Sequence, residues 1–472
     1  MNWKNIFKSF KNSDMRNRVL AVLGIIVVYR FMAHIPVPLA QPTELKDIMD
    51  SAIQSNSFGG FLNLLSGGAL ASFSIMLVGL APYITASVIS QLLTKAIPKL
   101  EEMHKDGESG RRKINQWTRI ITLPLAILQS IAYIFILRQT VLSGATTIVE
   151  MSTGQWVVAV SAMAAGAMML MWLGEIITEK GIGNGISLLI FAGIVSQLPR
   201  TLGSLGSALF TVSDPSQAFH MFNWFTIPWL NHSAAILLLI VGLIALGVLY
   251  ILVKINEGQR IITINYAKRV HGNSAYGGIK SILPIKLITA GVIPVIFAVA
   301  FLALPAFVGQ LMVATGHNVE LGQNLIVWFQ RSSANSFSAT GDWTQWIYPI
   351  SYFLLVVAFT YFYTSIVFNS REISENLQKQ GGFIDGVRPG RQTEKYLTKI
   401  VNRLTLFGSI ALGLIAVLPF VFEYVFTVLG MSSAASTLAI GGTGLLIVVS
   451  VALESIRQLN SRALMVTYDE YK

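Results

Sequence analysis

The stretch GLAPYI, Gly79 to Ile84, lies in the middle of an apolar run of about membrane length. Glycine and proline are poorly tolerated inside a helix, because glycine adds backbone freedom while proline removes a hydrogen bond and clashes with the preceding turn. In lipid such a break is tolerated only where the freed carbonyl faces protein or water. We therefore expect Pro82 to bend a membrane span beside a shared interior.

The whole chain has the composition of a protein whose solvent is lipid. It has 472 residues, of which 53% are hydrophobic and 12% charged, with a mean hydropathy of +0.61. The chain contains no cysteine, and its six histidines are scattered, so disulfides, thiol chemistry, a metal site and a cofactor are not expected. The first apolar run ends at Pro36-Val37-Pro38, so we interpret it as an uncleaved first span.

Windows of about nineteen residues predict ten membrane spans. These lie near residues 18–35, 73–94, 117–138, 155–175, 186–204, 233–254, 285–313, 345–369, 399–420 and 436–458. Twenty-nine of the 34 basic residues fall in the two terminal segments and the even-numbered loops, four fall in the odd-numbered loops, and Arg30 lies within the first span. Because cytoplasmic loops retain positive charge, the count predicts cytoplasmic termini and attraction to anionic lipids.

A second stretch, GVIPVI at Gly291 to Ile296, matches GLAPYI as Gly-x-x-Pro-x-Ile. The first lies in the second span and the other in the seventh, which is the second span of the last five. Two halves of five spans each would have opposite orientations in the membrane, as in an inverted repeat. The alternative is chance coincidence, because glycine and proline are common in membrane spans.

The predicted interior is neutral and branched-aliphatic, because nearly all 23 acidic residues fall in loops or at span ends. Ion-coupled carriers usually place ionisable side chains near the middle of the membrane. An aliphatic lining instead suits a constriction that excludes water and ions by dewetting. A secondary transporter of a small solute and a membrane insertase without a continuous pore are the alternative functions.

Several segments outside the spans have features of their own. The run Phe58 to Ser74 is too short to cross the membrane, and predicts either a re-entrant half-helix or an interfacial helix. EKGIGNG, Glu179 to Gly185, predicts a tight turn between helices. DGESGRRKI at Asp106 to Ile114 and the stretch Gly381 to Leu397 are hairpin-like, and Ile255 to Gly272 contains a strand-like run. The last two are either docking surfaces for a protein or an RNA backbone, or solvated loops.

Seven motifs in order resemble the SecY family, the channel subunits of the bacterial Sec protein translocase. They are LLSGGALASFSIMLVGLAPYITASVISQLL, DGESGRRKI, MWLGEIITEKGIGNGISLLIFAGI, EGQRIITINYAKR, LPIKLITAGVIPVIF, FNSREISENLQKQGGFIDGVRPGRQTEKYL and GGTGLLIVV. The resemblance implies an all-α polytopic membrane protein of ten transmembrane helices, in two inverted five-helix halves with a re-entrant plug helix. The halves would be residues 1–204 and 205–472.

The resemblance also implies the residues of a channel. The pore ring would be Leu80, Ile84, Ile186, Ile190, Ile296 and Ile447. The plug, at about residues 58–72, would include Phe61, Leu62, Leu64, Leu65, Ser66, Gly67 and Gly68. A lateral gate between the second and third spans and the seventh and eighth would be edged by Ser87, Gln91 and Asn184.

The partners implied by the resemblance are SecE, SecG, signal sequences, unfolded preproteins, and either the SecA ATPase or a translating ribosome. The large cytoplasmic loops at about 255–283 and 371–398 would bind the cytosolic partner through Arg260, Tyr266, Lys268, Arg269, Arg388, Pro389 and Gly390. The loop tip from Val270 to Ser274 lacks the further basic residues familiar in the family, which weakens the case for RNA contact there. We expect a passive channel in the bacterial plasma (inner) membrane that is no enzyme itself, with ATP hydrolysed by SecA.

Overall fold

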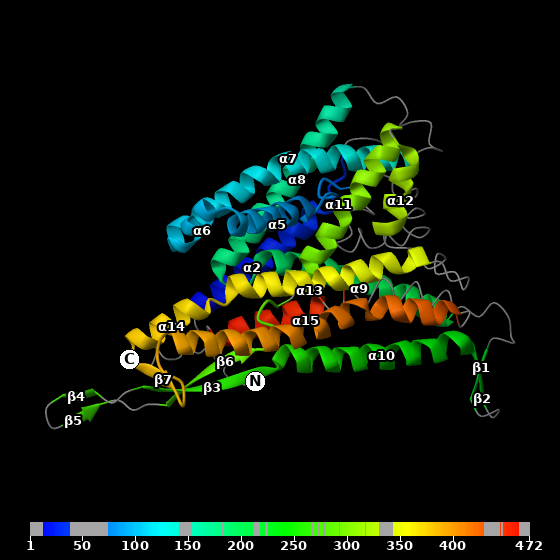
Figure 1. Cartoon of the computed structure of the whole chain (residues 1–472). Helices are drawn as coiled ribbons and strands as arrows, with labels where there is room; N and C mark the ends of the chain where they lie inside the picture. The colour runs from blue at the N-terminus through cyan, green and yellow to red at the C-terminus, as the bar shows by residue number, and fades with distance from the viewer. Residues whose placement is uncertain are drawn as a thin grey trace. The chain divides into compact units, whose positions relative to one another are not determined.

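The computed structural model describes most of the chain, and it is largely helical (Figure 1). The described residues are 13–37, 74–140, 153–181, 183–210, 218–221, 225–266, 269–271, 274–276, 280–291, 293–316, 318–329, 343–428, 444 and 447–461. The chain forms two compact units, of which the first comprises residues 1–244, 299–348 and 419–472 and the second residues 245–298 and 349–418.

The first unit contains most of the helices. They are α2 (Ser13–Met32), α5 (Ala81–Ala96), α6 (Pro98–Lys105), α7 (Glu108–Thr140), α8 (Thr153–Lys180), α9 (Gly185–Phe210), α12 (Val319–Phe329) and the 3-10 helix η3 (Trp343–Trp346). Strands β1 (Ala218–Met221) and β2 (Phe225–Asn231) pair antiparallel. Four helices contribute residues to both units: α10 (His232–Glu257), α11 (Ile293–Thr315), α13 (Ile347–Val367) and α15 (Arg391–Val428).

The second unit contains a small antiparallel sheet. Its strands are ordered β6-β3-β7, with β3 at Gln259–Tyr266, β6 at Lys280–Lys286 and β7 at Gly382–Ile384. Helix α14 (Ser370–Lys379) precedes β7, while β4 (Arg269–His271) and β5 (Ser274–Tyr276) form a separate hairpin. The strand predicted within 255–272 is therefore confirmed as β3.

All ten predicted spans overlap helical residues. Five described segments are long and apolar enough to cross a membrane: Arg112–Ile134, Thr153–Lys180, Ile293–Val313, Trp343–Lys379 and Arg391–Val425. The helical, membrane-spanning fold class is thus confirmed. The second and seventh spans differ from expectation, because their helices begin only at Ala81 and Ile293.

The two matching stretches form the starts of helices, so the prediction that Pro82 bends a span was wrong. Pro82 and Pro294 are each the second residue of a helix, where the missing N–H has no helical partner to lose. Gly79 and Gly291 precede them with the same φ of 63°. This left-handed conformation favours glycine, and it recurs at the same position of the two matching stretches.

The segment before α5 is a buried run of turns. Ser74 pairs with Pro36 in an isolated bridge, and the Ile75 N–H donates to the Ile35 carbonyl at 3.0 Å. A Cβ built on Gly166 of α8 would lie 2.2 Å from the Ile75 carbonyl oxygen, so a larger residue at 166 would collide with this backbone. Non-helical backbone here is satisfied by protein, as lipid would require.

The predicted turn at EKGIGNG is confirmed, since α8 ends at Lys180 and α9 begins at Gly185. Gly181 and Gly183 have φ of 73° and 128°, and these positive values explain why glycine occupies both positions. The expected hairpin at 106–114 was wrong: after a two-residue turn α7 starts at Glu108, and residues 108–114 form its first two turns.

Candidate functional site

Five of the six predicted pore residues lie at the starts of described helices, and Ile447 lies among helical residues. Leu80 is the N-cap of α5, and the Ile84 N–H donates to its carbonyl at 3.0 Å. Ile84 and Ile296 are the fourth residues of α5 and α11, and so hold the same position in the two matching stretches. Ile186 and Ile190 lie one turn apart at the start of α9, which places them on one face.

Burial of these residues is high. Leu80, Ile84, Ile190, Ile296 and Ile447 are all buried, with Ile190 only 2% exposed, while Ile186 is half-buried. Side chains of this kind offer no ligand for a metal or a charged solute. Ile296 belongs to the second unit and the other five to the first, and their arrangement as one ring stays a prediction.

Two of the predicted gate residues contact each other. Gln91 Nε2 donates to Ser87 Oγ at 3.2 Å on one face of α5. Gln91 Oε1 is buried and has no hydrogen-bond partner among the described residues. A buried amide oxygen without a hydrogen-bond donor is unfavourable.

Asn184 has a structural role as the cap of α9. Its Oδ1 accepts from the Ile186 and Ser187 N–H groups at 3.1 and 3.4 Å. The preceding turn is fixed further by Thr178 Oγ1, which accepts from the Gly185 N–H at 2.9 Å. The role of Asn184 at a lateral gate stays a prediction. The plug also stays a prediction, because its residues lie outside the described part of the chain. Lys268, a predicted docking residue, lies outside it as well.

Tyr266, one of the predicted docking residues, packs against an apolar core in the second unit. This core joins the sheet, α14 and the start of α15, through Ile262, Ile264, Ile285, Leu377, Ile384, Leu397, Ile400 and Val401. Ile262 and Ile264 alternate with exposed residues along β3, as expected of a sheet with one buried face. The core therefore holds the sheet against the two helices.

The other face of this sheet exposes apolar side chains that sequence reasoning missed. Ile261, Ile282 and Phe383 are 54%, 59% and 38% exposed. The register pairs Thr263 with Ile282 and Asn265 with Phe383, so all three side chains lie on one face. We name these three residues the apolar sheet face. The sequence could have indicated this face, because alternation in QRIITINY and KSILPIK places one set of apolar residues on the outward side of the sheet.

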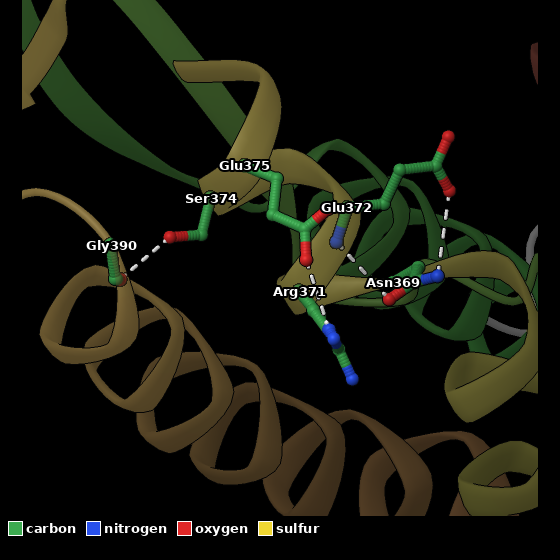
Figure 2. Close-up of polar contacts among 6 residues, drawn as sticks. All are labelled: Asn369, Arg371, Glu372, Ser374, Glu375 and Gly390. Carbon is green, nitrogen blue, oxygen red and sulfur yellow. Dashed lines mark hydrogen bonds and ion pairs between the residues drawn. The ribbon is translucent and has the colours of Figure 1, made fainter. Parts of the chain in front are cut away.

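The GVRPG turn, Gly386 to Gly390, is held by side chains from both neighbouring helices. Ser374 Oγ of α14 donates to the Gly390 carbonyl at 2.7 Å, as Figure 2 shows, and Thr393 Oγ1 of α15 donates to the Arg388 carbonyl at 3.0 Å. Both hydroxyl-bearing residues are buried, while Arg388 and Pro389 are exposed. The turn thus presents Arg388 on an ordered backbone.

Helix α14 begins with a reciprocal cap, also visible in Figure 2. The Asn369 Oδ1 accepts from the Glu372 N–H at 3.3 Å, and Asn369 Nδ2 donates to Glu372 Oε2 at 3.4 Å. Arg371 Nε donates to Glu375 Oε1 at 3.0 Å. These contacts fix the helix that carries Ser374.

Two further contacts tie β3 to its surroundings. Asn265 Nδ2 donates to Asp385 Oδ1 at 2.6 Å, and the Tyr266 hydroxyl donates to Gln380 Oε1 at 3.5 Å. Of the other predicted docking residues, Arg260 is exposed at the start of β3 and Arg269 begins β4. The structure thus brings Tyr266 and the GVRPG turn to the same small domain built on one core.

An ion pair between α7 and α8 was also missed from sequence. Arg119 Nε donates to Glu175 Oε1 at 2.8 Å, and Arg119 Nη2 lies 2.7 Å from Glu175 Oε2. The Glu175 side chain is 18% exposed and the Arg119 side chain 46%. A two-point contact of this geometry is among the stronger ones that a partly exposed pair can make.

Comparisons with known proteins agree with this architecture. The SecY family profile matches residues 74–456. The chain is 38% identical over 473 residues to the protein translocase subunit SecY of Corynebacterium glutamicum, and 37% identical over 469 residues to that of Streptomyces coelicolor. Each alignment covers 98% of both chains.

Solved structures share the fold at lower identity. A protein-conducting channel superimposes with a TM-score of 0.58 at 19% identity, covering 93% of this chain and 90% of the other. Sec61 in the canine ribosome–channel complex from the endoplasmic reticulum gives a TM-score of 0.56 at 18% identity, over the same shares of the two chains. With the family profile and the full-length relatives, these observations establish that the chain belongs to the SecY family.

Proposed function

We propose that this chain is the membrane channel of a protein translocase. It conducts unfolded secretory polypeptides across the plasma membrane and releases transmembrane segments sideways into the bilayer. The observation that carries the proposal is the relationship to translocase subunits over 98% of both chains. The relatives and this chain therefore share the whole membrane domain rather than a common module.

The aliphatic residues at the helix starts suit such a channel. Dispersion contacts do not depend on the sequence that passes, so isoleucine and leucine side chains can close around any extended polypeptide. An empty aliphatic constriction also excludes water and ions. A signal sequence that binds the open form more tightly than the closed form would shift the channel toward opening.

We propose that two halves, residues 1–204 and 205–472, lie in the membrane with opposite orientation and with both termini in the cytoplasm. The matched left-handed glycines at 79 and 291, each two residues before a helix, support the repeat. The basic residues of alternate loops support the orientation. The charge of those loops would also draw anionic lipids to the cytoplasmic face.

We propose that the second unit's GVRPG turn and sheet dock a cytosolic partner, either the SecA ATPase or a translating ribosome. The exposed Arg388 on an ordered turn would supply a charged contact, and the apolar sheet face would supply a desolvated one. The chain itself would remain a passive subunit, with ATP hydrolysis in SecA. SecE and SecG are the small membrane subunits expected beside it.

The channel proposal is tested by planar-bilayer conductance of the purified complex. Ile190→Asn places an amide in an aliphatic environment that excludes water, so the closed channel should leak ions, whereas Ile190→Leu should stay sealed. Deletion of residues 58–72 should also increase leakage if these residues act as a plug. Equal, low conductance of all variants would contradict a hydrophobic seal at this position.

A stalled secretory chain provides the complementary test. Photo-crosslinkers at Ile84 and Ile190 should label the stalled polypeptide, because these positions would line its path. An insertase without a pore should give no label there, and uptake of a small solute by the chain alone would instead favour a secondary transporter.

A further inference from the structure

Helix α12 changes character along its length. Its sequence is VELGQNLIVWF, in which Glu320, Gln323 and Asn324 all fall within the first six residues. The last five residues, Leu325 to Phe329, are all apolar. A helix lying flat in water or at the membrane surface would keep a polar stripe along its whole length, so this gradient indicates an environment that becomes more apolar toward the carboxyl end.

Two glycines bring α12 against α11 in the first unit. A Cβ built on Gly309 of α11 would lie 2.7 Å from the Gly322 carbonyl oxygen and 2.9 Å from Leu325 Cβ. A Cβ built on Gly322 would in turn lie 2.8 Å from the Gly309 carbonyl oxygen. The two backbones therefore approach closely, as small residues permit between membrane helices.

The chain reverses direction between these helices in a short turn. Gly316 and Asn318 have φ of 71° and 53°, and the Gly322 N–H donates to the Asn318 carbonyl at 3.0 Å. Helix α12 consequently runs back along α11 as an antiparallel hairpin. Each further residue of α12 lies opposite an earlier residue of α11.

The depth of α12 follows from this pairing. The membrane-compatible part of α11 is Ile293–Val313, and Gly309 lies four residues inside its end, or about 6 Å at the helical rise per residue. Leu325 and Ile326 lie within 3.2 Å of the Cβ position of Gly309, and therefore share its depth. Val327 and Trp328 follow, and both side chains are exposed.

We propose that α12 dips from the membrane surface into the bilayer, and that Val327 and Trp328 contact lipid acyl chains. These side chains are 59% and 37% exposed, at a depth where the exposed surface meets hydrocarbon. The exposed Glu320 and Gln323 at the other end would remain among headgroups and water. Tryptophan is favoured at this boundary because its ring is apolar while its N–H can bond to headgroups or water.

The absence of cysteine from the 472-residue sequence makes a direct test available. Single cysteines would be introduced as Val327→Cys and, as a matched exposed control on the first turn, Leu321→Cys, in the full chain reconstituted in phospholipid vesicles. A water-soluble maleimide should label Val327→Cys at least tenfold more slowly than Leu321→Cys. The two should react equally in detergent after denaturation, and Trp328→Cys should behave like Val327→Cys.

Nitroxide labels on the same cysteines distinguish lipid from protein. Oxygen dissolves in acyl chains whereas a nickel chelate stays in water, so the label at 327 should collide often with oxygen and rarely with nickel. Frequent collision with nickel would place α12 in water, and rare collision with both would show that protein covers this face. Either result would overturn the proposal.

A second perturbation tests the hairpin itself. Gly309→Leu should displace α12 from α11 and speed maleimide labelling of Val327→Cys toward the rate at position 321. The control is Gly24→Leu in α2, where a built Cβ meets nothing within 4 Å. Unchanged labelling with Gly309→Leu would show that contact with α11 does not set the depth of α12.

Discussion

The GVRPG turn should loosen when its two side-chain hydrogen bonds are removed. Ser374→Ala deletes the 2.7 Å bond to the Gly390 carbonyl, and Thr393→Val deletes the 3.0 Å bond to the Arg388 carbonyl while keeping the side-chain shape. Both residues are buried, at 3% and 2% exposed. Each bond contributes about 1 kcal/mol net, so the double variant should favour local opening by about 2 kcal/mol.

An energy of about 2 kcal/mol corresponds to roughly a thirtyfold larger opening equilibrium, since 1.4 kcal/mol is a factor of ten. Hydrogen exchange followed by mass spectrometry of peptides covering 384–394 measures this opening directly. The Val387 and Glu394 N–H groups, which donate to Ile384 and Gly390 carbonyls at 3.0 and 3.1 Å, should exchange correspondingly faster. Affinity for a cytosolic partner that contacts Arg388 should fall as well.

The matched control is Thr398→Val. Thr398 is exposed and its Oγ1 donates to the Glu394 carbonyl within the same helix at 2.9 Å, a bond that adds little to helix stability. Exchange in residues 384–394 should be unchanged by it. If the double variant also leaves this exchange unchanged, or speeds exchange equally throughout the chain, the two hydroxyls do not order the turn.

Two further substitutions test contacts within the first unit. Gly185→Ala places a Cβ 1.9 Å from the Gly174 carbonyl oxygen, so it should destabilise the chain by about 1–3 kcal/mol and lower the thermal midpoint in detergent. The control is Gly203→Ala in the same helix, where a built Cβ meets nothing within 4 Å and the thermal midpoint should not change. A double-mutant cycle of Arg119→Gln and Glu175→Gln should give a coupling of about 1 kcal/mol by thermal unfolding, and a coupling near zero would show that the pair is only geometric.

The ten spans predicted from apolar runs all overlap helical residues, whereas the short helices α6, α12 and α14 were not predicted from sequence. A run of about twenty apolar residues can satisfy its backbone in lipid only as a helix, so hydropathy and helix formation coincide over most spans. Helix starts were harder to predict. Hydropathy continues smoothly from Ser74 through Ala96, yet the backbone is a set of turns until Leu80, because Gly79 adopts a left-handed conformation.

In the docking region, too, local sequence patterns predicted some features, whereas others depended on packing between distant segments. The β-branched run in QRIITINY predicted β3, since alternation and branching are local properties. The outward position of Ile261 depended instead on pairing with β6 and on the core beneath, which joins residues more than one hundred positions apart. The pairing of Arg119 with Glu175 likewise depends on how α7 packs on α8, which no local pattern records.

Gly79 and Gly291 hold two points of the backbone in a conformation that favours D-amino acids over L-amino acids. A φ of 63° suits the mirror-image form of alanine as well as −63° suits the natural one, while L-alanine there would be strained by roughly 1–2 kcal/mol. D-alanine installed by chemical ligation should therefore preserve both turns. Two residues before each helix, the chain thus passes through a conformation that suits the opposite enantiomer of every chiral amino acid.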